Sequence, residues 1–504
     1  MHNNPVMLII LDGFGYSNDT QYNAIYKAQM PYFKQWMHEY PHALLHAAGN
    51  YVGLPDGYIG NSEVGHETIG AGRIIEQPIT HVNNEIQNGN FFKDSLLQEK
   101  LKQLAKSGHA LHIIGLLSDA GVHAHIEHMY AYMYAAVQAG IQRIYVHPIL
   151  DGRDTKPCSA ENFLTELQKK TEECGAIIAS MHGRFYAMDR NANWDRTLQS
   201  YRVLTQKPSH ITTITWSEVL ETNYAQSNTD EFIVPTLLDP KGIVQPKDGI
   251  IFTNIRADRA RQLTRCFIAP QTVPQLYKSM PLSFFITPYS YGVDIHTDIL
   301  YMHPIITNTL KEVLSKAGCS LFSIAETEKY AHITYFFNGQ KESSVPNEIR
   351  HLVPSKTVRD YSKLPAMSAP EITKAVLRSL MHEPRDFYLI NYANPDMVGH
   401  SGNFDATVQA LEIVDEQLGQ LYAVAVLQMG GTLFITGDHG KAESMADPES
   451  GNPITAHTTN DVPFVIVTAT LPSAENINAP LTQLADIAPC ILTQMGIPVP
   501  PEMK

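Results

Sequence analysis

Cysteine is scarce in this 504-residue sequence. The five cysteines are scattered along the chain, are odd in number, and include no Cys-x-x-Cys pair. They are Cys158, Cys174, Cys266, Cys319 and Cys490. This pattern argues against a disulfide framework and predicts reduced thiols in a reducing compartment.

Long hydrophobic runs are also lacking. The first apolar run, Val6 to Leu11, is too short for the hydrophobic region of a signal peptide, and no basic region precedes it. No other stretch approaches the length needed to span a bilayer. We therefore expect a cytoplasmic protein without a membrane partner.

An excess of positive charge is the third absence. The formal net charge is −14, whereas binding to nucleic acid needs clustered lysines and arginines on a basic surface. We therefore expect no nucleic-acid partner. A small anionic substrate is not excluded, because it needs only a local group of arginines.

The composition is that of a globular protein, with 44% hydrophobic and 17% charged residues, and the length allows two domains. Short apolar runs recur, each followed by a polar or glycine-containing turn. They are 6–11, 111–117, 144–150, 387–390 and 432–436. Helical patterns lie between them, for example Ala406–Leu421 and Thr309–Ala317, the second closed by Gly318. This alternation predicts an α/β fold with helices on both faces of its sheets.

The distribution of polar residues suggests two domains. Potential metal ligands lie near the N-terminus and again after residue 390, whereas arginines that suit an anion lie between about 120 and 265. The simplest arrangement is a discontinuous metal-binding domain, residues 1–76 and 311–504, with an inserted substrate-binding domain, residues 77–310. The segments Glu76–Thr80 and Tyr289–Pro304 would be the two linkers and form a hinge.

Several aspartates and histidines are placed as metal ligands. Asp396 and His400 are four residues apart and share a face on a helical turn. The remaining candidates follow predicted strands or lie in a polar loop: Asp12, Asp438, His439 and His457. Each one alone is more often a turn, cap or core residue, so the prediction depends on the set. Oxygen and imidazole ligands without thiolates favour Mn²⁺, Zn²⁺, Mg²⁺ or Co²⁺. Two neighbouring ions would suit an in-line displacement.

Ser62 is the candidate nucleophile. It follows Gly60-Asn61 and precedes a helix-compatible run, so we expect it at a helix N-terminus, where free amides and the helix dipole favour negative charge. A nearby dication would lower the pKa of its hydroxyl. The structural alternative is an ordinary serine N-cap with Glu67 nearby.

Arginines and an aspartate in the middle of the chain suggest an anion-binding cluster. They are Arg153, Asp154, Arg184, Arg190, Arg256 and Arg259. Guanidinium groups match both carboxylate and phosphate. Arg256 and Arg259 would share a face if their segment is helical. The alternative is a set of solvated arginines with local aspartate partners, which we favour for Arg261 and Arg265.

Long strings from these regions together resemble the cofactor-independent (2,3-bisphosphoglycerate-independent) phosphoglycerate mutases of the alkaline phosphatase superfamily. The strings are 9–15, Gly60–His66 (GNSEVGH), Leu150–Thr155 (LDGRDT), Glu326–His332 (ETEKYAH), Asn391–His400 (NYANPDMVGH), Asp438–Gly440 and Thr455–Asn460. The resemblance covers nearly the whole chain. It implies two α/β domains, an alkaline-phosphatase-like discontinuous domain with an inserted substrate-binding domain.

The resemblance also implies a mechanism and its residues. Asp396, His400 and His457 would hold one divalent ion, and Asp12, Ser62, Asp438 and His439 a second, with Mn²⁺ as the usual ion. Ser62 would carry the phosphoryl group between 3-phosphoglycerate and 2-phosphoglycerate in glycolysis and gluconeogenesis, with Asp154 as acid and base. The substrate would be bound by His123, Arg153, Asp154, Arg184, Arg190, Arg256, Arg259 and Lys329. The resemblance implies a monomer.

Some positions depart from the family pattern. Ala257 stands where proline is usual, Asn191 and Asn193 replace charged residues, and Lys441 stands where asparagine is usual. None of these changes removes a proposed ligand. Lys441 follows Asp438-His439-Gly440, so its charge would either disfavour a dication or point into solvent.

Two rival hypotheses remain at this level. A metal-dependent phosphatase or another mutase of the superfamily, such as a phosphopentomutase, would share the metal ligands and differ in the arginine-rich domain. A non-enzymatic metal-binding scaffold would bind metal without turnover, although loss of catalysis normally appears first at the nucleophile or a ligand, and all of these residues are present here.

Overall fold

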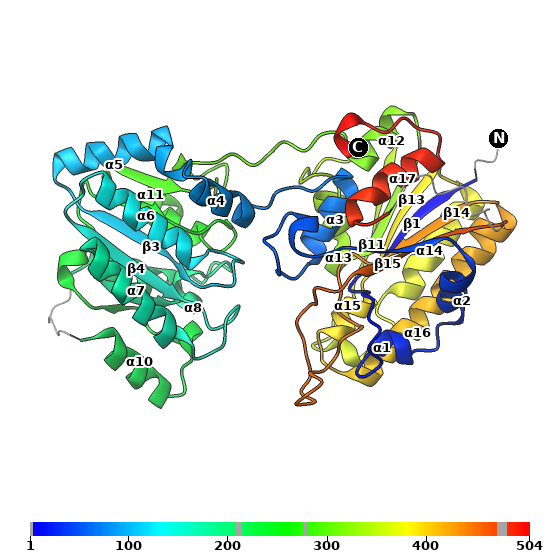
Figure 1. Cartoon of the computed structure of the whole chain (residues 1–504), viewed down its shortest axis with the longest axis horizontal. Coiled ribbons are helices and arrows are strands. Elements are labelled where there is room, and N and C mark those ends of the chain that lie inside the picture. The colour runs from blue at the N-terminus through cyan, green and yellow to red at the C-terminus, as the bar shows by residue number, and fades with distance from the viewer. Residues whose placement is uncertain (1–3, 208–213, 277, 279, 471–480) are drawn as a thin grey trace. The chain divides into compact units, whose positions relative to one another are not determined.

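The computed structural model describes residues 4–207, 214–276, 278, 280–470 and 481–504. The chain separates into two compact units (Figure 1). The first unit contains Met1–Gln77 and Ile305–Lys504, and the second contains Pro78–Pro304. Residues 305–310 therefore lie with the first unit, where Ile306 packs against Ala71 and Ile75.

The sheet of the first unit is mainly parallel. In spatial order it contains β12 (Glu348–Val353), β11 (Leu321–Glu326), β13 (Phe387–Tyr392), β1 (Val6–Leu11), β14 (Thr432–Thr436), β15 (Val462–Thr468) and β2 (His42–Leu45). The pairs from β12 to β14 are parallel, and β15 and β2 add antiparallel pairs at one edge. The carboxyl ends of β1, β13 and β14 therefore meet at one edge of the sheet.

Helices cover both faces of this sheet (Figure 1). Those of eight residues or more are α2 (Pro31–Glu39), α3 (Ser62–Ala71), α14 (Ala369–His382), α16 (Phe404–Leu421) and α17 (Ile487–Gln494), and the shorter ones are α1 (Ala24–Lys27), α12 (Leu310–Lys316), α13 (Thr327–Ala331) and α15 (Asn394–Gly399). Alternate side chains of β1 pack into the two cores: Met7, Ile9 and Leu11 face α2, α14 and α16, whereas the others face α3, α12 and α17. A strand buried on both faces reads as a continuous apolar run, which is why VMLIIL predicts it.

The second unit has the same architecture. Its strands are β10 (Asp298–Ile299), β9 (Phe284–Thr287), β8 (Gly249–Phe252), β3 (Leu111–Leu117), β4 (Ile144–Leu150), β6 (Ser180–Gly183) and β7 (Thr236–Leu237) in spatial order, with β5 (Ile177–Ile178) beside β4. Its helices are α4 (Pro78–Gln87), α5 (Ser95–Ser107), α6 (Ile126–Gln138), α7 (Ala160–Cys174), α8 (Arg184–Ala187), α9 (Trp194–Thr205), α10 (Trp216–Ala225) and α11 (Arg261–Ile268). Cores of apolar side chains lie on both faces of the sheet.

The predicted α/β class is confirmed, whereas the helix on which a shared face of Arg256 and Arg259 depended is not formed. The segment 254–260 forms bends and turns, and α11 begins only at Arg261, so Arg256 and Arg259 do not share a helical face. No described helix is long and apolar enough to cross a membrane.

Candidate metal centre and anion-binding cluster

The ends of three neighbouring strands supply the polar residues at the edge of the first sheet. Asp12 follows β1, and its amide donates a hydrogen bond to Tyr392 O at the end of β13 (3.0 Å). Asp438 follows β14 after a single glycine. Gly13, in the left-handed conformation (φ 70°), donates its amide to Asp438 Oδ1 (3.0 Å). The parallel sheet therefore brings together two aspartates that are more than 400 residues apart in sequence.

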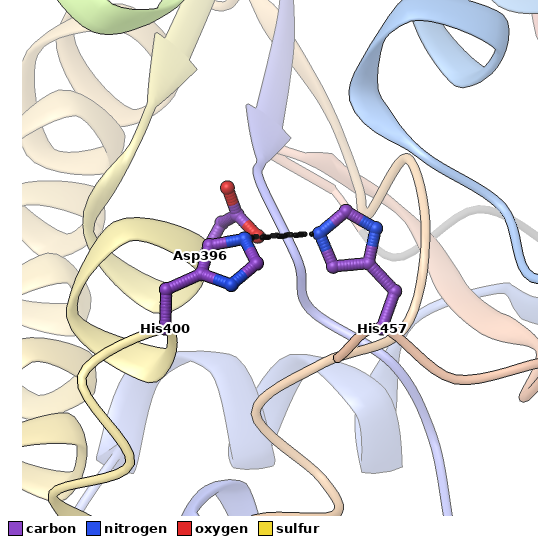
Figure 2. Close-up of side chains that lie close together, drawn as sticks. All are labelled: Asp396, His400 and His457. Carbon is purple, nitrogen blue, oxygen red and sulfur yellow. Dashed lines mark hydrogen bonds and ion pairs between the residues drawn. The ribbon is translucent and has the colours of Figure 1, made fainter. Parts of the chain in front are cut away.

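Asp396, His400 and His457 form a first cluster of candidate metal ligands (Figure 2). Asp396 and His400 lie on successive turns at α15, and His457 approaches from the loop that precedes β15. The Nε2 atoms of both histidines lie 3.2 Å from Asp396 Oδ1 and 3.1 Å from each other.

The protons of this cluster are fixed by its outer contacts. His400 Nδ1 donates to Thr455 O (2.7 Å), and His457 Nδ1 donates to Gly60 O (2.9 Å), so in the neutral rings both Nε2 atoms carry lone pairs. Asp396 Oδ1 is buried and has no hydrogen-bond partner. Three acceptors thus converge without a donor between them, an arrangement that fits a divalent cation.

The second cluster surrounds Ser62. The Ser62 hydroxyl lies 3.0 Å from both Asp12 Oδ1 and His439 Nε2. His439 Nε2 is also 3.4 Å from Asp12 Oδ1 and 3.7 Å from Asp438 Oδ2, and the latter oxygen is buried without a hydrogen bond. Burial opposes a charge on His439, yet the surrounding carboxylates outweigh it and raise its pKa to about 9. The cluster therefore attracts positive charge, as a cation site must.

Local sequence explains how Ser62 is presented. Asn61 is the N-cap of α3 and accepts a hydrogen bond from Val64 N (3.1 Å), so Ser62 is the first helical residue and the N-cap alternative for Ser62 is wrong. A Cβ at Gly65 would lie 2.4 Å from the Asp438 carbonyl oxygen, so only glycine lets α3 approach this loop. The serine hydroxyl therefore lies at a helix N-terminus, among the candidate ligands.

Lys329 of α13 lies at the centre of these groups. Its buried ammonium group contacts Asp12 Oδ1 (2.7 Å), Ser62 Oγ (2.7 Å) and Asp396 Oδ2 (2.6 Å). Burial opposes the charge of Lys329, but the attraction of Asp12 and Asp396 outweighs it and raises the pKa of the ammonium group. The pKa values of Asp12 and Asp396 are lowered, because Lys329 outweighs the burial of each carboxyl. Lys329 thus links the two clusters through the serine.

Two further buried side chains, Asn391 and His66, contact the second cluster, and the sequence did not single them out. Asn391 Nδ2 lies 2.9 Å from Asp12 Oδ2 and 3.0 Å from His66 Nε2. His66 Nδ1 lies 2.9 Å from Ser62 O and 3.0 Å from Asp438 Oδ2. Both residues belong to strings that carry the resemblance, which was one available signal. Asn391 also follows the apolar run 387–390, whereas His66 follows no predicted strand.

In the second unit, Arg184 is the buried centre of the predicted anion-binding cluster. Its Nη1 atom contacts Asp151 Oδ1 (2.5 Å) and Asp154 Oδ2 (2.6 Å). Asp154 Oδ2 is also 4.0 Å from His123 Nε2. Burial lowers the pKa of His123, and the nearby arginines Arg184 and Arg256 lower it further. Asp151 follows β4 and orients Arg184 from within the protein, and its role was not predicted.

Asp258 connects three of the predicted substrate-binding residues. It contacts Arg190 Nη1 (2.8 Å), Arg256 Nε (3.3 Å) and His123 Nδ1 (3.6 Å). The sequence analysis did not single out Asp258. Its position shows that the cluster holds one carboxylate within reach of three cationic or potentially cationic groups.

Arg259 and Arg153 complete the cluster. Arg259 donates to Met188 O (3.3 Å), and its pKa is lowered by burial and by the positive charges of Arg184, Arg190 and Arg153. Arg153 is more open, with 57% of its side chain exposed, and lies 3.6 Å from Glu231. The lowered pKa of Arg259 marks a site of positive potential that an anion would relieve.

Definite contacts are found for Lys441, which the sequence left open, and for Arg261 and Arg265, for which solvated side chains with local aspartate partners were favoured. Lys441 is fully buried and does not point into solvent, and its ammonium group donates to Ile454 O (3.1 Å). Arg265 pairs with Asp294 (2.7 Å), and Arg261 donates to Tyr291 O, so neither contacts the anion-binding cluster through these groups.

Two family models match the chain. Residues 82–291 match the BPG-independent PGAM N-terminus, and residues 302–458 match type I phosphodiesterase / nucleotide pyrophosphatase. The first match lies within the second unit. Apart from residues 302–304, the second match lies in the part of the first unit that holds Lys329 and most of the candidate ligands.

Relatives match over essentially the full length. The chain is 45% identical to a 2,3-bisphosphoglycerate-independent phosphoglycerate mutase of Synechococcus sp. (99% of this chain, 94% of the relative) and 44% identical to that of Legionella pneumophila (100% and 97%). Among solved structures, phosphoglycerate mutase of Leishmania mexicana, determined at low cobalt concentration, aligns with a TM-score of 0.77 at 29% identity, covering 100% of this chain and 97% of that one. With these matches along its whole length, the chain belongs to the 2,3-bisphosphoglycerate-independent phosphoglycerate mutase family.

Proposed function

We propose that this enzyme interconverts 3-phosphoglycerate and 2-phosphoglycerate, in glycolysis and gluconeogenesis, through a phosphoserine at Ser62. One observation carries the proposal. The Ser62 hydroxyl, at the first turn of α3, lies within hydrogen-bond distance of Asp12, His439 and Lys329 beside a cluster of unsatisfied acceptors. Full-length relatives carrying the mutase name support the choice of reaction.

The metal part of the proposal assigns two divalent ions, with Mn²⁺ as the physiological ion. Asp396, His400 and His457 would hold one, and Asp12, Ser62, Asp438 and His439 the other. When bound, such ions lower the pKa of the serine hydroxyl and neutralise charge on a phosphoryl group. The convergence of acceptors around Asp396 and the orphaned Oδ2 of Asp438 support this assignment.

The remaining steps use residues of the chain. Ser62 Oγ, having lost its proton, attacks phosphorus, and the bond from phosphorus to the 3-oxygen breaks while Asp154 gives that oxygen a proton. Asp154 then takes the proton of the 2-hydroxyl, whose oxygen attacks the phosphoserine and releases Ser62, which regains its proton. Lys329 neutralises charge on the transferring group. His123, Arg153, Arg184, Arg190, Arg256 and Arg259 hold the carboxylate and hydroxyls of glycerate during its reorientation.

Exclusion of water distinguishes this reaction from that of a phosphatase, since water would hydrolyse the phosphoserine. We also propose that the enzyme works as a monomer in the cytoplasm, in keeping with its five free cysteines. Size-exclusion chromatography with light scattering measures the oligomeric state, and a stable dimer would overturn that part of the proposal.

The first experiment measures conversion of 3-phosphoglycerate to 2-phosphoglycerate by the chelator-treated protein, with and without added Mn²⁺ and without 2,3-bisphosphoglycerate. We expect turnover only with metal. Ser62→Ala should bind 3-phosphoglycerate and lack turnover. Release of inorganic phosphate without isomerisation would favour the phosphatase hypothesis, and substantial mutase activity of Ser62→Ala would exclude the phosphoserine route.

A further inference from the structure

Asn391 and His66 form a buried relay between the two carboxylates of the second cluster. Both side chains are fully buried, Asn391 at the end of β13 and His66 on the second turn of α3. The amide group of Asn391 lies between Asp12 and His66, and His66 lies between Asn391 and the pair formed by the Ser62 carbonyl and Asp438. The proposed mechanism assigns no role to either residue.

The orientation of Asn391 follows from its neighbour Asp12. Asp12 Oδ1 forms an ion pair with the Lys329 ammonium group (2.7 Å), so Asp12 Oδ2, 2.9 Å from the Asn391 side chain, is a carboxylate oxygen that only accepts. The amide therefore presents its nitrogen there, and the two N–H bonds serve Asp12 Oδ2 and His66 Nε2. The opposite orientation would place an oxygen against the carboxylate. The two N–H donors of the buried amide would then no longer face Asp12 Oδ2 and His66 Nε2.

This orientation also fixes the tautomer of His66. Because Nε2 accepts from Asn391, Nδ1 carries the proton, which is donated to Ser62 O (2.9 Å) beside Asp438 Oδ2 (3.0 Å). Both ring nitrogens are thus engaged, and neither offers a free lone pair to a cation. Asp12, His66 and Asp438 lie close enough together to suggest that His66 is a ligand, but its hydrogen bonds argue against that role.

We propose that Asn391 and His66 are positioning residues that orient the ligands of the second cation. Each carboxylate has one oxygen held by an N–H donor, Asp12 Oδ2 by Asn391 and Asp438 Oδ1 by Gly13. The other oxygen of each is thereby directed to the serine side of the site, and Asp438 Oδ2 has no hydrogen bond there. Outer partners of this kind fix ligand orientation and strengthen metal binding.

The inference rests on the proposed metal centre and predicts a selective effect. The histidines of the first cluster are oriented by backbone carbonyls, those of Thr455 and Gly60, and make no hydrogen bond to Asn391 or His66. Loss of the relay should therefore weaken the second cation site and spare the first.

The test is a titration of metal-free protein with Mn²⁺. Binding is measured by calorimetry and by the loss of the electron paramagnetic resonance signal of free Mn²⁺. The Asn391→Leu change keeps the side-chain volume and removes both donors. We expect the second site to bind Mn²⁺ about 10- to 100-fold more weakly, with the first unchanged. In a His400→Ala background, which disables the first site at a half-exposed residue, the loss should be seen on the remaining ion.

Asn338→Leu is the matched control. Asn338 is also buried in the first unit and donates to the backbone at Ser343 O (3.0 Å), but it contacts none of the candidate ligands through its amide. It should lower the melting temperature and leave Mn²⁺ affinity unchanged. Equal Mn²⁺ affinity in wild type and a folded Asn391→Leu variant would overturn the inference, whereas absence of Mn²⁺ binding by wild type would overturn the proposed metal centre itself.

A second variant separates positioning from ligation. His66→Phe retains a ring and removes both nitrogens. At saturating Mn²⁺, pulsed electron paramagnetic resonance with ¹⁵N-histidine should show the same histidine couplings in this variant as in wild type, together with a weakened affinity. Disappearance of one histidine coupling would make His66 a ligand and overturn the positioning role.

Discussion

Lys329 shows how single residues balance charge within the metal centre. Its ammonium group is the buried counter-charge of Asp12 and Asp396, which belong to different candidate metal sites. Without that group the two carboxylates would be left buried with less compensation, and removing one partner of a buried ion pair costs about 3–5 kcal/mol. Divalent ions would supply the same compensation, so the stability of the metal-free enzyme should depend on Lys329 more than that of the loaded enzyme.

We therefore expect Lys329→Met to lower the free energy of unfolding of the metal-free protein by about 3 kcal/mol, and Mn²⁺ to restore more stability than it gives wild type. The same change should reduce kcat by about 10²–10³-fold, since one donor to the transferring group is lost. Calorimetry with and without Mn²⁺ checks the first effect.

Lys311→Met provides the control for Lys329. Lys311 is also buried in the first unit, and it pairs with Glu348 (2.6 Å) away from the candidate ligands. This variant should be destabilised without special rescue by Mn²⁺. Equal rescue of both variants would show that Lys329 is not the counter-charge of the metal-binding carboxylates.

The sequence indicated candidate residues where a side chain directly follows an apolar strand. Asp12 and Asp438 were found in this way, because parallel strands bring their ends to one edge of a sheet. Asn391 also follows an apolar run, 387–390, but it was given no role, and β13 extends beyond that run to Tyr392. Asp258 was not singled out, because its contact with His123 depends on a turn that no sequence periodicity shows.

At the scale of elements, continuous apolar runs predicted β1, β3, β4 and β14 with their observed bounds. Each is buried on both faces, so every position in the run is apolar or nearly so. The shared helical face considered for Arg256 and Arg259 does not form, for a different reason. That segment is held by loop contacts, including Ile255 N to His123 O (2.8 Å), which local propensity does not encode.

A chain of buried polar side chains connects the residue before β8 with three neighbouring strands of the second unit. From Asp248 before β8 it runs to His112 on β3 (3.2 Å) and His147 on β4 (3.0 Å), then to Ser180 (2.7 Å) and His182 (2.8 Å) on β6. Because His112 donates to Asp248, His112 accepts from His147, His147 accepts from Ser180, and His182 Nε2 donates to Ser180 Oγ, whereas His182 Nδ1 is buried without a hydrogen-bond partner. Burial lowers the pKa of all three histidines, that of His182 to about 3.

This chain predicts acid sensitivity. The pKa of His182 falls from 6.5 when unfolded to about 3 when folded, so between these values only the unfolded state gains a proton. Stability is therefore full above pH 6.5 and is lost as pH falls toward 3. We expect the unfolding free energy of wild type to drop by about 1.4 kcal/mol per pH unit more than that of His182→Gln between pH 6 and 4.

Urea unfolding followed by fluorescence of Trp194 and Trp216, both in the second unit, checks the His182 prediction. Above pH 7 the difference between the two proteins should be independent of pH, which is the internal control. Parallel pH profiles throughout would mean that His182 titrates equally in the folded and unfolded states.

Lys441 joins the segment after β14 to the loop that carries His457. Its ammonium group donates to Ile454 O, three residues before His457, and its stem packs against Gly399 of α15. Lys441→Met preserves most of the buried volume and leaves the Ile454 carbonyl without this donor. We expect a loss of about 1–3 kcal/mol in stability and faster proteolytic cleavage between residues 444 and 458.

Limited proteolysis with mass spectrometry measures the effect of Lys441→Met, and Lys356→Met is the control. Lys356 is an exposed lysine paired with Glu371 (2.5 Å), and an exposed pair contributes little. The same cleavage rate in the 444–458 loop for both variants would show that Lys441 does not anchor that loop.

At the scale of the whole molecule, the functional residues divide between the two units. Every residue assigned to metal binding lies in the first unit, and every arginine of the anion-binding cluster lies in the second. Each unit has its own sheet and its own cores on both faces. A ligand that binds only residues of one unit should therefore stabilise that unit alone.

We expect Mn²⁺ and 3-phosphoglycerate, added separately to metal-free enzyme, to raise the unfolding transitions of different units. A ligand present at 100 times its Kd adds about 2.7 kcal/mol to the unit that binds it. Scanning calorimetry resolves the transitions, and fluorescence assigns them in single-tryptophan variants, because Trp36 lies in the first unit and Trp194 and Trp216 in the second. Two results would contradict this expectation. A shift of the Trp36 transition by 3-phosphoglycerate alone would place the primary anion site in the first unit. A shift of the second unit's transition by Mn²⁺ alone would show that the second unit contains a metal ligand. If Mn²⁺ raises only the transition reported by Trp36, and 3-phosphoglycerate raises only the transition reported by Trp194 and Trp216, the metal site and the anion site lie in different units. A discontinuous metal-binding domain with an inserted substrate-binding domain requires this result.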